Sequence, residues 1–297
     1  MAFGHKKMNK PNKVAFRDYL SLVKFSHTIF AFPFAIIGFF LSIYLTDHTF
    51  SWSLFVKVIL CMIFARNAAI SFNRVTDRFI DKRNPRNSSR EIPSGRIHPR
   101  DAFIFSMTNA LLFIATTFFI NKIVFYLSPI VLIVLLGYTY TKRFTVLCHF
   151  VLGLGLSLAP IGAYLAVTGQ WHIVPLLFSL IVFLWVGGFD ILYSIQDEAF
   201  DKEESIKTMP AVLGKRKSRV ISAVLHIAVL LLVLKVGYLL DSGVLYWAGA
   251  VAFVSLLITQ HLIIKPSNAK SVNFAYATLN GLASMLFAAF NIVSYYF

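Results

Sequence analysis

The chain has 297 residues, of which 58% are hydrophobic and 14% charged, and so apolar a composition excludes an ordinary soluble domain. The formal net charge is +15, which in a soluble protein would indicate nucleic-acid binding. Here, however, 24 of the 28 Lys and Arg residues fall in the N-terminal tail and in alternate loops, as in the cytoplasmic loops of membrane proteins. We therefore expect an integral membrane protein that contacts the lipid bilayer and binds no nucleic acid.

The apolar runs predict an all-α membrane protein with nine transmembrane helices. A helix needs roughly 20 apolar residues to cross the hydrocarbon, whereas a transmembrane barrel would show short alternating segments. Nine crossings with basic inner loops place the N-terminus in the cytoplasm. A basic cytoplasmic tail, 1–20, precedes a single transmembrane domain, 21–297, with expected helices 25–45, 52–81, 102–120, 123–140, 146–167, 173–201, 220–240, 244–264 and 274–296.

Two polar stripes follow apolar helices on the same predicted membrane face. In the first stripe, Asn73, Asp77 and Asp81 recur every four residues and share one face if the helix continues through them. The second repeats this spacing at Asp197 and Asp201. A single such stripe is usually a solvated helix end with local salt bridges. Two of them resist desolvation unless a cation is bound between them, so we expect a functional site.

The chemistry of the two stripes favours a hard divalent cation. Four carboxylates without His or Cys suit Mg²⁺, which proteins often bind together with substrate phosphates. Nearby basic side chains, each of which alone would only mark a cytoplasmic loop, can neutralise the phosphate oxygens that the metal leaves uncovered. The basic side chains near the stripes are Arg78, Lys82, Lys142, Arg143 and Lys202. Cys61 and Cys148 are isolated and lack metal-ligand spacing.

An ionisable residue lies deeper on the face of each stripe. Arg66 precedes Asn73 by seven residues, which places it on nearly the same face and about 10 Å further into the membrane. Asp190 stands in the same relation to Asp197. An arginine inside a spanning helix costs several kcal/mol. We expect Arg66 either to pair with Asp190 or to hold a substrate carboxylate through two parallel hydrogen bonds.

Taken together, these residues resemble the UbiA-type intramembrane prenyltransferases, a family with nine helices around a central cavity. The resemblance covers almost the whole chain, and within the family it is closest to the hydroxybenzoate polyprenyltransferase branch. Its most specific parts are Asn73-x3-Asp77-x3-Asp81, Tyr193-x3-Asp197-x3-Asp201 preceded by Asp190, and the pair Lys142-Arg143.

The resemblance implies Mg²⁺-dependent transfer of a polyprenyl group from polyprenyl diphosphate to a small aromatic acid such as 4-hydroxybenzoate, in quinone biosynthesis. It also implies a bacterial inner membrane, and the basic loops predict that the mouth of the site faces the cytoplasm. The residue roles that follow from it are Mg²⁺ ligands at Asp77, Asp81, Asp197 and Asp201; diphosphate contacts at Asn73, Lys142 and Arg143; acceptor carboxylate binding at Arg66; and acceptor hydroxyl binding at the catalytic Asp190 or at Tyr193.

Two alternatives remain open on the sequence. Arg74, Gln196 and the segment Arg90-Glu91-Ile92-Pro93-Ser94-Gly95 are more similar to members proposed to prenylate a dihydroxynaphthoate in the futalosine route to menaquinone. An ion-coupled transporter would also contain intramembrane Asp and Arg. It predicts inverted repeats and polar residues at mid-membrane, whereas here the acids cluster at one face.

Overall fold

The computed structural model describes residues 16–23, 32–264 and 269–297, and in these ranges the chain is helical without a strand. Eight helices there are long and apolar enough to cross a membrane. Helix α2 is shorter, and the residues directly before it lie outside the described ranges. These ranges also leave out residues 1–15 of the predicted tail and the first part of the expected helix 25–45. The principal helices are α2 Phe32–Leu45, α3 Trp52–Thr76, α5 Pro99–Phe118, α6 Lys122–Thr141, α7 Cys148–Thr168, α8 Ile173–Ser194, α11 Lys215–Leu239, α12 Val244–Ile263, α13 Ala269–Phe274 and α14 Asn280–Ser294.

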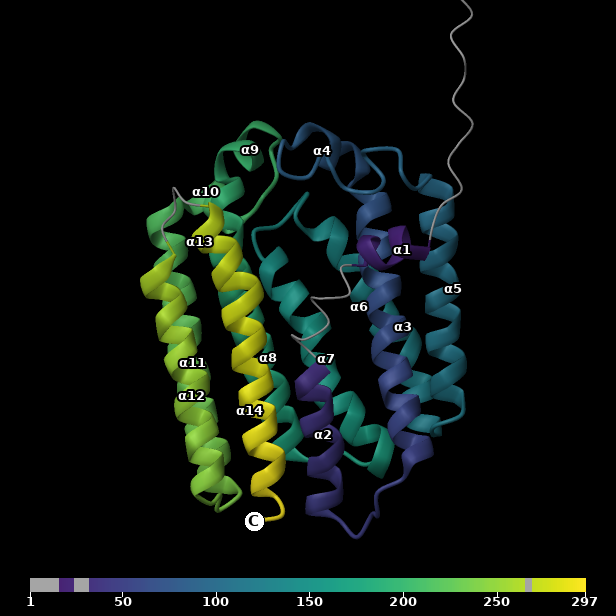
Figure 1. Cartoon of the computed structure of the whole chain (residues 1–297), viewed down its shortest axis with the longest axis vertical. Coiled ribbons are helices and arrows are strands. Elements are labelled where there is room, and N and C mark those ends of the chain that lie inside the picture. The colour runs from purple at the N-terminus through teal and green to yellow at the C-terminus, as the bar shows by residue number, and fades with distance from the viewer. Residues whose placement is uncertain (1–15, 24–31, 265–268) are drawn as a thin grey trace, which may run out of the picture.

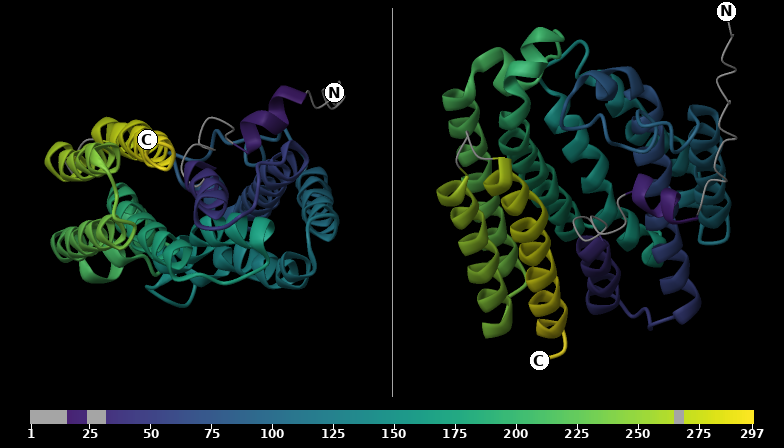
Figure 2. Two further views of the ribbon diagram at one scale, coloured as in Figure 1. Left: turned by 90° about the horizontal axis from the view of Figure 1, so that it is seen from below. Right: turned by 45° about the horizontal axis from the view of Figure 1, so that its top comes forward.

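The all-α membrane fold is thereby confirmed, while the count of nine crossings and the cytoplasmic N-terminus stay predictions. The helices run side by side and roughly parallel to one another (Figures 1 and 2). Many large apolar side chains are exposed on their outer faces, including Leu111 at 68% and Ile133 at 71%. Exposed apolar surface of this extent is what a helix facing lipid requires.

Short helices gather at one end of the molecule, opposite the C-terminus (Figure 1). They are α4 Arg78–Arg83, α9 Glu198–Glu203 and α10 Met209–Leu213. The expected unbroken helix 52–81 is wrong, because Asp77 adopts φ −91° and ψ 2° and separates α3 from α4. Asp197, with φ −98° and ψ 2°, separates α8 and a 3₁₀ turn from α9 in the same way.

The interruption redirects the helix without ending its hydrogen bonding. The amide of Asp77 still donates to the carbonyl of Asn73 at 2.9 Å, and the amide of Asp81 donates to that of Asp77 at 2.8 Å. Backbone near ψ 0° lies in the sparsely allowed bridge region, where one residue can bend the chain. Asp81 and Asp201 then occupy the same position, the fourth, of two six-residue helices.

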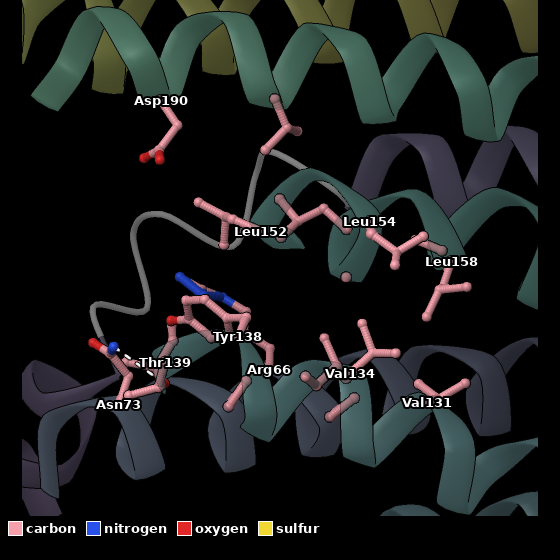
Figure 3. Close-up of a pocket in the computed structure, with 18 of the residues that line it drawn as sticks. Arg66, Asn73, Val131, Val134, Tyr138, Thr139, Leu152, Leu154, Leu158 and Asp190 are labelled. Carbon is pink, nitrogen blue, oxygen red and sulfur yellow. Dashed lines mark hydrogen bonds between the residues drawn. The ribbon is translucent and has the colours of Figure 1, made fainter. Parts of the chain in front are cut away.

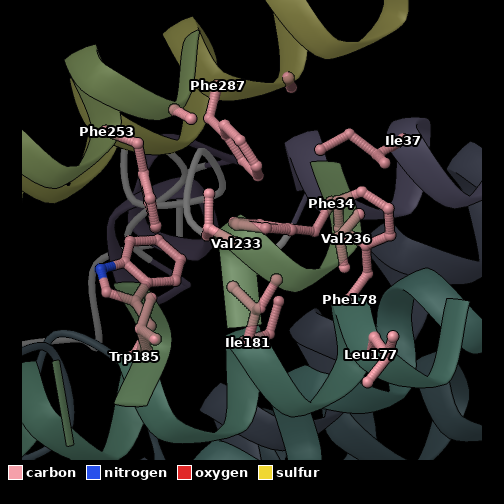
Figure 4. Packing of buried hydrophobic residues seen from close by; sticks show 14 of the residues in the cluster. Phe34, Ile37, Leu177, Phe178, Ile181, Trp185, Val233, Val236, Phe253 and Phe287 are labelled. Carbon is pink, nitrogen blue, oxygen red and sulfur yellow. The ribbon is translucent and has the colours of Figure 1, made fainter. Parts of the chain in front are cut away.

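Close helix contacts and an aromatic core hold the spanning helices that carry the stripes. Glycine is required at Gly38, because a Cβ there would lie 2.1 Å from the carbonyl oxygen of Pro160 on α7. Figure 4 shows Phe34, Trp185, Phe253 and Phe287 packed between α2, α8, α12 and α14. The Phe253 and Phe287 rings are stacked with centroids 4.9 Å apart. This core fixes α8, which carries the second stripe.

Candidate active site

A single cavity of about 770 Å³ reaches both stripes. Its walls come from α3, α6, α7 and α8, and its polar end is bordered by residues of α4 and α9. Figure 3 shows the change of character along it, from Asn73 and Thr139, past Arg66 and Tyr138, to apolar side chains such as Val131 and Leu158. A volume of this size, with an apolar lining along most of its length and polar groups gathered at one end, is typical of a small-molecule site.

The first stripe is held by two side chains that converge on Asp77. This carboxylate is buried, and its Oδ2 accepts hydrogen bonds from Lys142 Nζ at 2.5 Å and from Asn73 Nδ2 at 3.0 Å. Asn73 comes from the preceding turn of α3 and also contacts Thr139 Oγ1 at 3.3 Å. Lys142 is placed there because it directly follows α6 as its C-cap residue. The Asn-x3-Asp spacing therefore serves to orient one carboxylate.

Asp81 is surrounded by arginines. Arg90 donates to its Oδ1 at 2.7 Å, and Arg74 approaches Oδ2 at 4.0 Å. Arg90 belongs to the loop between α4 and α5, which turns back toward the cavity. The positive charges balance a carboxylate that is only 3% exposed, and an unpaired buried charge would be strongly destabilising.

The same loop also reaches the second stripe. Arg86 donates from Nε to Asp197 Oδ1 at 3.0 Å and from Nη2 to Oδ2, and its Nη1 donates to Tyr193 Oη at 2.6 Å. Asn84 Nδ2 adds a contact to Asp197 Oδ1 at 3.3 Å. Asp201 accepts a hydrogen bond from Thr208 Oγ1 at 2.8 Å. The loop that follows the first stripe thus provides the partners of the second, and this brings the two acidic segments together.

The deeper acid has a partner that the sequence did not suggest. His149 Nδ1 lies 2.6 Å from Asp190 Oδ2, and the amide of Met209 donates to His149 Nε2 at 3.2 Å. Because Nε2 accepts that bond, the hydrogen shared with Asp190 resides on Nδ1. The hypothesis of an Arg66–Asp190 pair therefore gives way to a His149–Asp190 pair. Arg66 lines the same cavity beside Tyr138 (Figure 3).

Nine of the ten residues to which the resemblance assigns a role line this cavity, whereas Arg78, Lys82 and Lys202, which were also expected to neutralise phosphate, do not. The exception among the ten is Arg143, which lies behind the first stripe, where its Nη2 donates to the carbonyl of Thr76 at 3.1 Å and lies 3.7 Å from Asp77 Oδ1. Sequence reasoning missed several cavity residues, although the four-residue spacing of two arginines directly after the first stripe was a usable signal. The missed residues are Asn84, Arg86, Arg90, Tyr138, His149 and Thr208.

The donor set fits a hard cation shared with a substrate. The buried atoms Asp77 Oδ1 and Asp81 Oδ2 have no hydrogen-bond partner and are therefore available acceptors. No group of three or more His, Cys, Asp or Glu side chains close enough to hold a metal occurs in the described parts of the chain. A cation here would take one or two oxygens from each stripe and the remainder from water and phosphate, which is the ligand pattern of Mg²⁺.

Comparisons with known proteins agree with this geometry. The model of the UbiA prenyltransferase family matches residues 31–291. The 4-hydroxybenzoate octaprenyltransferase of Aliivibrio fischeri strain MJ11 is 29% identical over 239 residues, which are 80% of this chain and 83% of that protein. The enzyme of the same name from Serratia proteamaculans strain 568 is 31% identical over 199 residues, which are 67% of this chain and 68% of that protein.

Solved structures show the same fold. A UbiA homolog from Aeropyrum pernix K1 superposes with a TM-score of 0.81 at 27% identity, covering 90% of this chain and 97% of that one. A UbiA homolog from Archaeoglobus fulgidus bound to GPP and Mg²⁺ gives a TM-score of 0.70 at 22% identity, covering 94% of this chain and all of that one. With a family model that spans most of its length, the chain belongs to the UbiA prenyltransferase family and is a prenyltransferase.

Proposed function

We propose that this enzyme transfers a polyprenyl group from a polyprenyl diphosphate to a hydroxylated aromatic carboxylic acid of the 4-hydroxybenzoate kind, with Mg²⁺ as cofactor. The observation that carries the proposal is the single cavity, which has both acidic stripes at one end and an apolar lining along the rest. The names of the bacterial relatives and the GPP and Mg²⁺ bound to the Archaeoglobus fulgidus homolog support it.

The acidic end is suited to a diphosphate with its metal. Asp77, Asp81, Asp197 and Asp201 would hold Mg²⁺, which when bound stabilises the negative charge of the departing diphosphate. Three cations of the chain, Arg86, Arg90 and Lys142, now contact these carboxylates. When a substrate binds, the same cations can donate to its phosphate oxygens, since guanidinium and ammonium groups bind phosphate as readily as carboxylate.

The apolar part of the cavity takes the prenyl chain and excludes water. Side chains such as Val131, Val134, Leu154 and Leu158 face one another across it (Figure 3). Breaking the bond between the allylic carbon and the diphosphate oxygen develops positive charge on that carbon. The rings of Tyr193 and Tyr276, whose centroids are 4.0 Å apart, border the cavity next to the acidic end. Their faces can stabilise such a charge while exclusion of water prevents hydrolysis.

We place the aromatic acceptor in the part of the cavity that is lined by Arg66 and Asp190. The Arg66 guanidinium would hold the acceptor carboxylate through paired hydrogen bonds. Asp190, oriented by His149, would accept a hydrogen bond from the phenolic hydroxyl and then take up the ring proton that is lost when the new carbon–carbon bond forms. Tyr193 is already committed to Arg86 through its hydroxyl, so Asp190 is the better candidate for this role.

The residues that separate this chain from the ubiquinone-route pattern lie at the metal end. Arg74 and Arg90 contact Asp81, and Gln196 Nε2 donates to the carbonyl of Tyr193. Arg74 and Arg90 therefore act on the diphosphate end of the cavity, whereas Gln196 does not line it. These residues do not by themselves favour a dihydroxynaphthoate over 4-hydroxybenzoate. Membership of a prenyltransferase family removes the support for an ion-coupled transporter.

The enzyme is an integral membrane protein, and we further propose that it lies in a bacterial inner membrane with the acidic stripes facing the cytoplasm. The basic residues support this orientation, because 24 of 28 fall in the tail and the loops that the sequence predicts on the side of the stripes. Labelling of single introduced cysteines from either side of intact cells tests it. Labelling of the loop between α4 and α5 from outside the cell would contradict it.

The reaction is tested with the purified enzyme, a labelled polyprenyl diphosphate and a panel of aromatic acids containing 4-hydroxybenzoate, a dihydroxynaphthoate and benzoate, each with Mg²⁺ or with EDTA. We expect a Mg²⁺-dependent product whose mass equals acceptor plus prenyl minus one hydrogen, formed together with one diphosphate. Benzoate, which lacks the activating hydroxyl, should give none. Equal product formation with EDTA, or diphosphate release without a prenylated acid in the whole panel, would reject the proposal.

A further inference from the structure

A second hollow, of about 640 Å³, lies behind the first stripe. It is formed by the end of α3, by α4, by the beginning of α5, by the end of α6 and by residues 204–206 after α9. Three arginines and several aromatic side chains line it, and none of these residues lines the main cavity. The lining includes Phe72, Arg78, Phe79, Phe103, Tyr140 and Arg143.

The hollow has an excess of positive charge. Its one carboxylate, Glu204, accepts hydrogen bonds from Arg83 Nε at 2.7 Å and from Arg83 Nη2 at 2.5 Å. The hydrogen bond from Arg83 holds the pKa of Glu204 below its usual value, so this pair remains ionised and balanced. Arg78 faces no further acid in the lining. Arg143 lies 3.7 Å from Asp77, but that carboxylate belongs to the main cavity and is already paired with Lys142.

Both of these arginines cap α3 and still retain donors. Arg78 Nη1 donates to the carbonyl of Val75 at 2.7 Å, and Arg143 Nη2 donates to that of Thr76 at 3.1 Å. These contacts complement the negative end of the helix dipole. A guanidinium has five N–H donors, so capping uses a minority of them. The two side chains can bind an anion without giving up the cap.

The aromatic residues beside the arginines are exposed. The ring of Phe72 lies 6.5 Å from that of Phe103 and 6.1 Å from that of Tyr140. Phe79 is 61% exposed, and Phe103 and Tyr140 are each 42% exposed. The Arg78 guanidinium lies over the Phe79 ring at 4.2 Å. Aromatic rings next to cations, at the end of apolar helices, are typical of the boundary between lipid tails and headgroups.

We propose that this hollow binds an anionic phospholipid of the surrounding leaflet. Arg78 and Arg143 hold the phosphate of its headgroup, and Phe72, Phe79 and Phe103 contact the beginning of its acyl chains. Charge complementarity selects an anion, and the exposed rings select an amphiphile over free phosphate. The bound lipid lies directly behind Asp77 and reinforces the α3 end at which the chain bends into the acidic stripe.

The test is binding of phosphatidylglycerol to the full chain in nanodiscs of neutral phosphatidylcholine, with the bound lipids counted by native mass spectrometry. We expect the wild-type protein to prefer phosphatidylglycerol by at least about tenfold, the effect of one charge-assisted contact. Arg78→Gln should lose most of that preference, and a double change with Arg143→Gln should lose all of it. The matched control is Arg216→Gln, which removes an exposed arginine at the start of α11.

Equal binding of the two lipids, an equal loss in Arg216→Gln, or displacement of the lipid by an equal concentration of inorganic phosphate would overturn the proposal. A measurement on the wild-type protein avoids any effect of the substitutions on folding. A photoactivatable phosphatidylglycerol should label peptides containing 72–83 or 140–143, and labelling confined to other peptides would also overturn it. Neither experiment needs turnover, so their failure is distinguishable from failure of the proposed transferase reaction.

Discussion

The most informative substitution is Arg86→Gln, because Arg86 bonds to both oxygens of Asp197 and to Tyr193. With no substrate, the guanidinium competes with Mg²⁺ for Asp197, so its removal should tighten the binding of Mg²⁺ alone. With substrate, it donates to a phosphate oxygen. One hydrogen bond to a charged group contributes about 1.5–3 kcal/mol, so its loss should raise the KM for the polyprenyl diphosphate roughly 10- to 100-fold.

These two effects have opposite signs and are measured separately. Mn²⁺, used in place of Mg²⁺, reports metal binding by electron paramagnetic resonance without diphosphate, and initial rates at saturating acceptor give the KM for the diphosphate. The control is Arg216→Gln, an exposed arginine outside the cavity, which should change neither quantity. An Arg86→Gln enzyme with unchanged KM, or with weaker metal binding, would show that Arg86 does not move from Asp197 to the substrate.

Three further substitutions test other parts of the account. Asp77→Asn should abolish turnover while the protein still folds, and normal turnover of this variant would remove the metal assignment. Asp47→Asn, in the exposed loop before α3, should change neither turnover nor folding. Arg66→Ala should raise the KM of the aromatic acid about 10- to 100-fold and the KM of the diphosphate less than about threefold. Equal changes in both KM values would exclude the binding of the acceptor carboxylate by Arg66. Gly38→Ala should lower the free energy of unfolding by about 1–3 kcal/mol or more, because its Cβ would lie 2.1 Å from a backbone oxygen of α7. The measurement is thermal denaturation. The control Gly137→Ala, whose Cβ meets nothing within 4 Å, should show no such loss of stability.

The fold class and most of the site were accessible from the sequence because both depend on periodic patterns. Runs of apolar residues specify spanning helices, and the four-residue repeat from Asn73 to Asp81 places those side chains on one face. The repeat survives in the structure through the bonds between the amides and the carbonyls four residues earlier. Its interruption at Asp77 was not predictable from periodicity, because the bend depends on how Lys142 and Arg143 approach the carboxylate and the last carbonyl of α3.

The contacts that the sequence missed are those that cross between distant segments. Arg86 and Asp197 are 111 residues apart, and His149 and Asp190 are 41 residues apart. Spacing along a helix carries no information about such pairs, because they depend on how one helix packs against another. The placement of Arg143 outside the cavity has the same cause. Its neighbour Lys142 points to Asp77 from the cavity side, and the turn after α6 directs Arg143 to the opposite side of that carboxylate.

We propose that both acidic stripes act together on one metal–diphosphate complex. The decisive measurement is electron paramagnetic resonance of Mn²⁺ titrated into the wild-type enzyme with a non-hydrolysable polyprenyl diphosphate analogue. We expect tight Mn²⁺ binding that requires the analogue and is lost in both Asp77→Asn and Asp197→Asn. Binding that is equally tight without the analogue, or that persists in either variant, would contradict it.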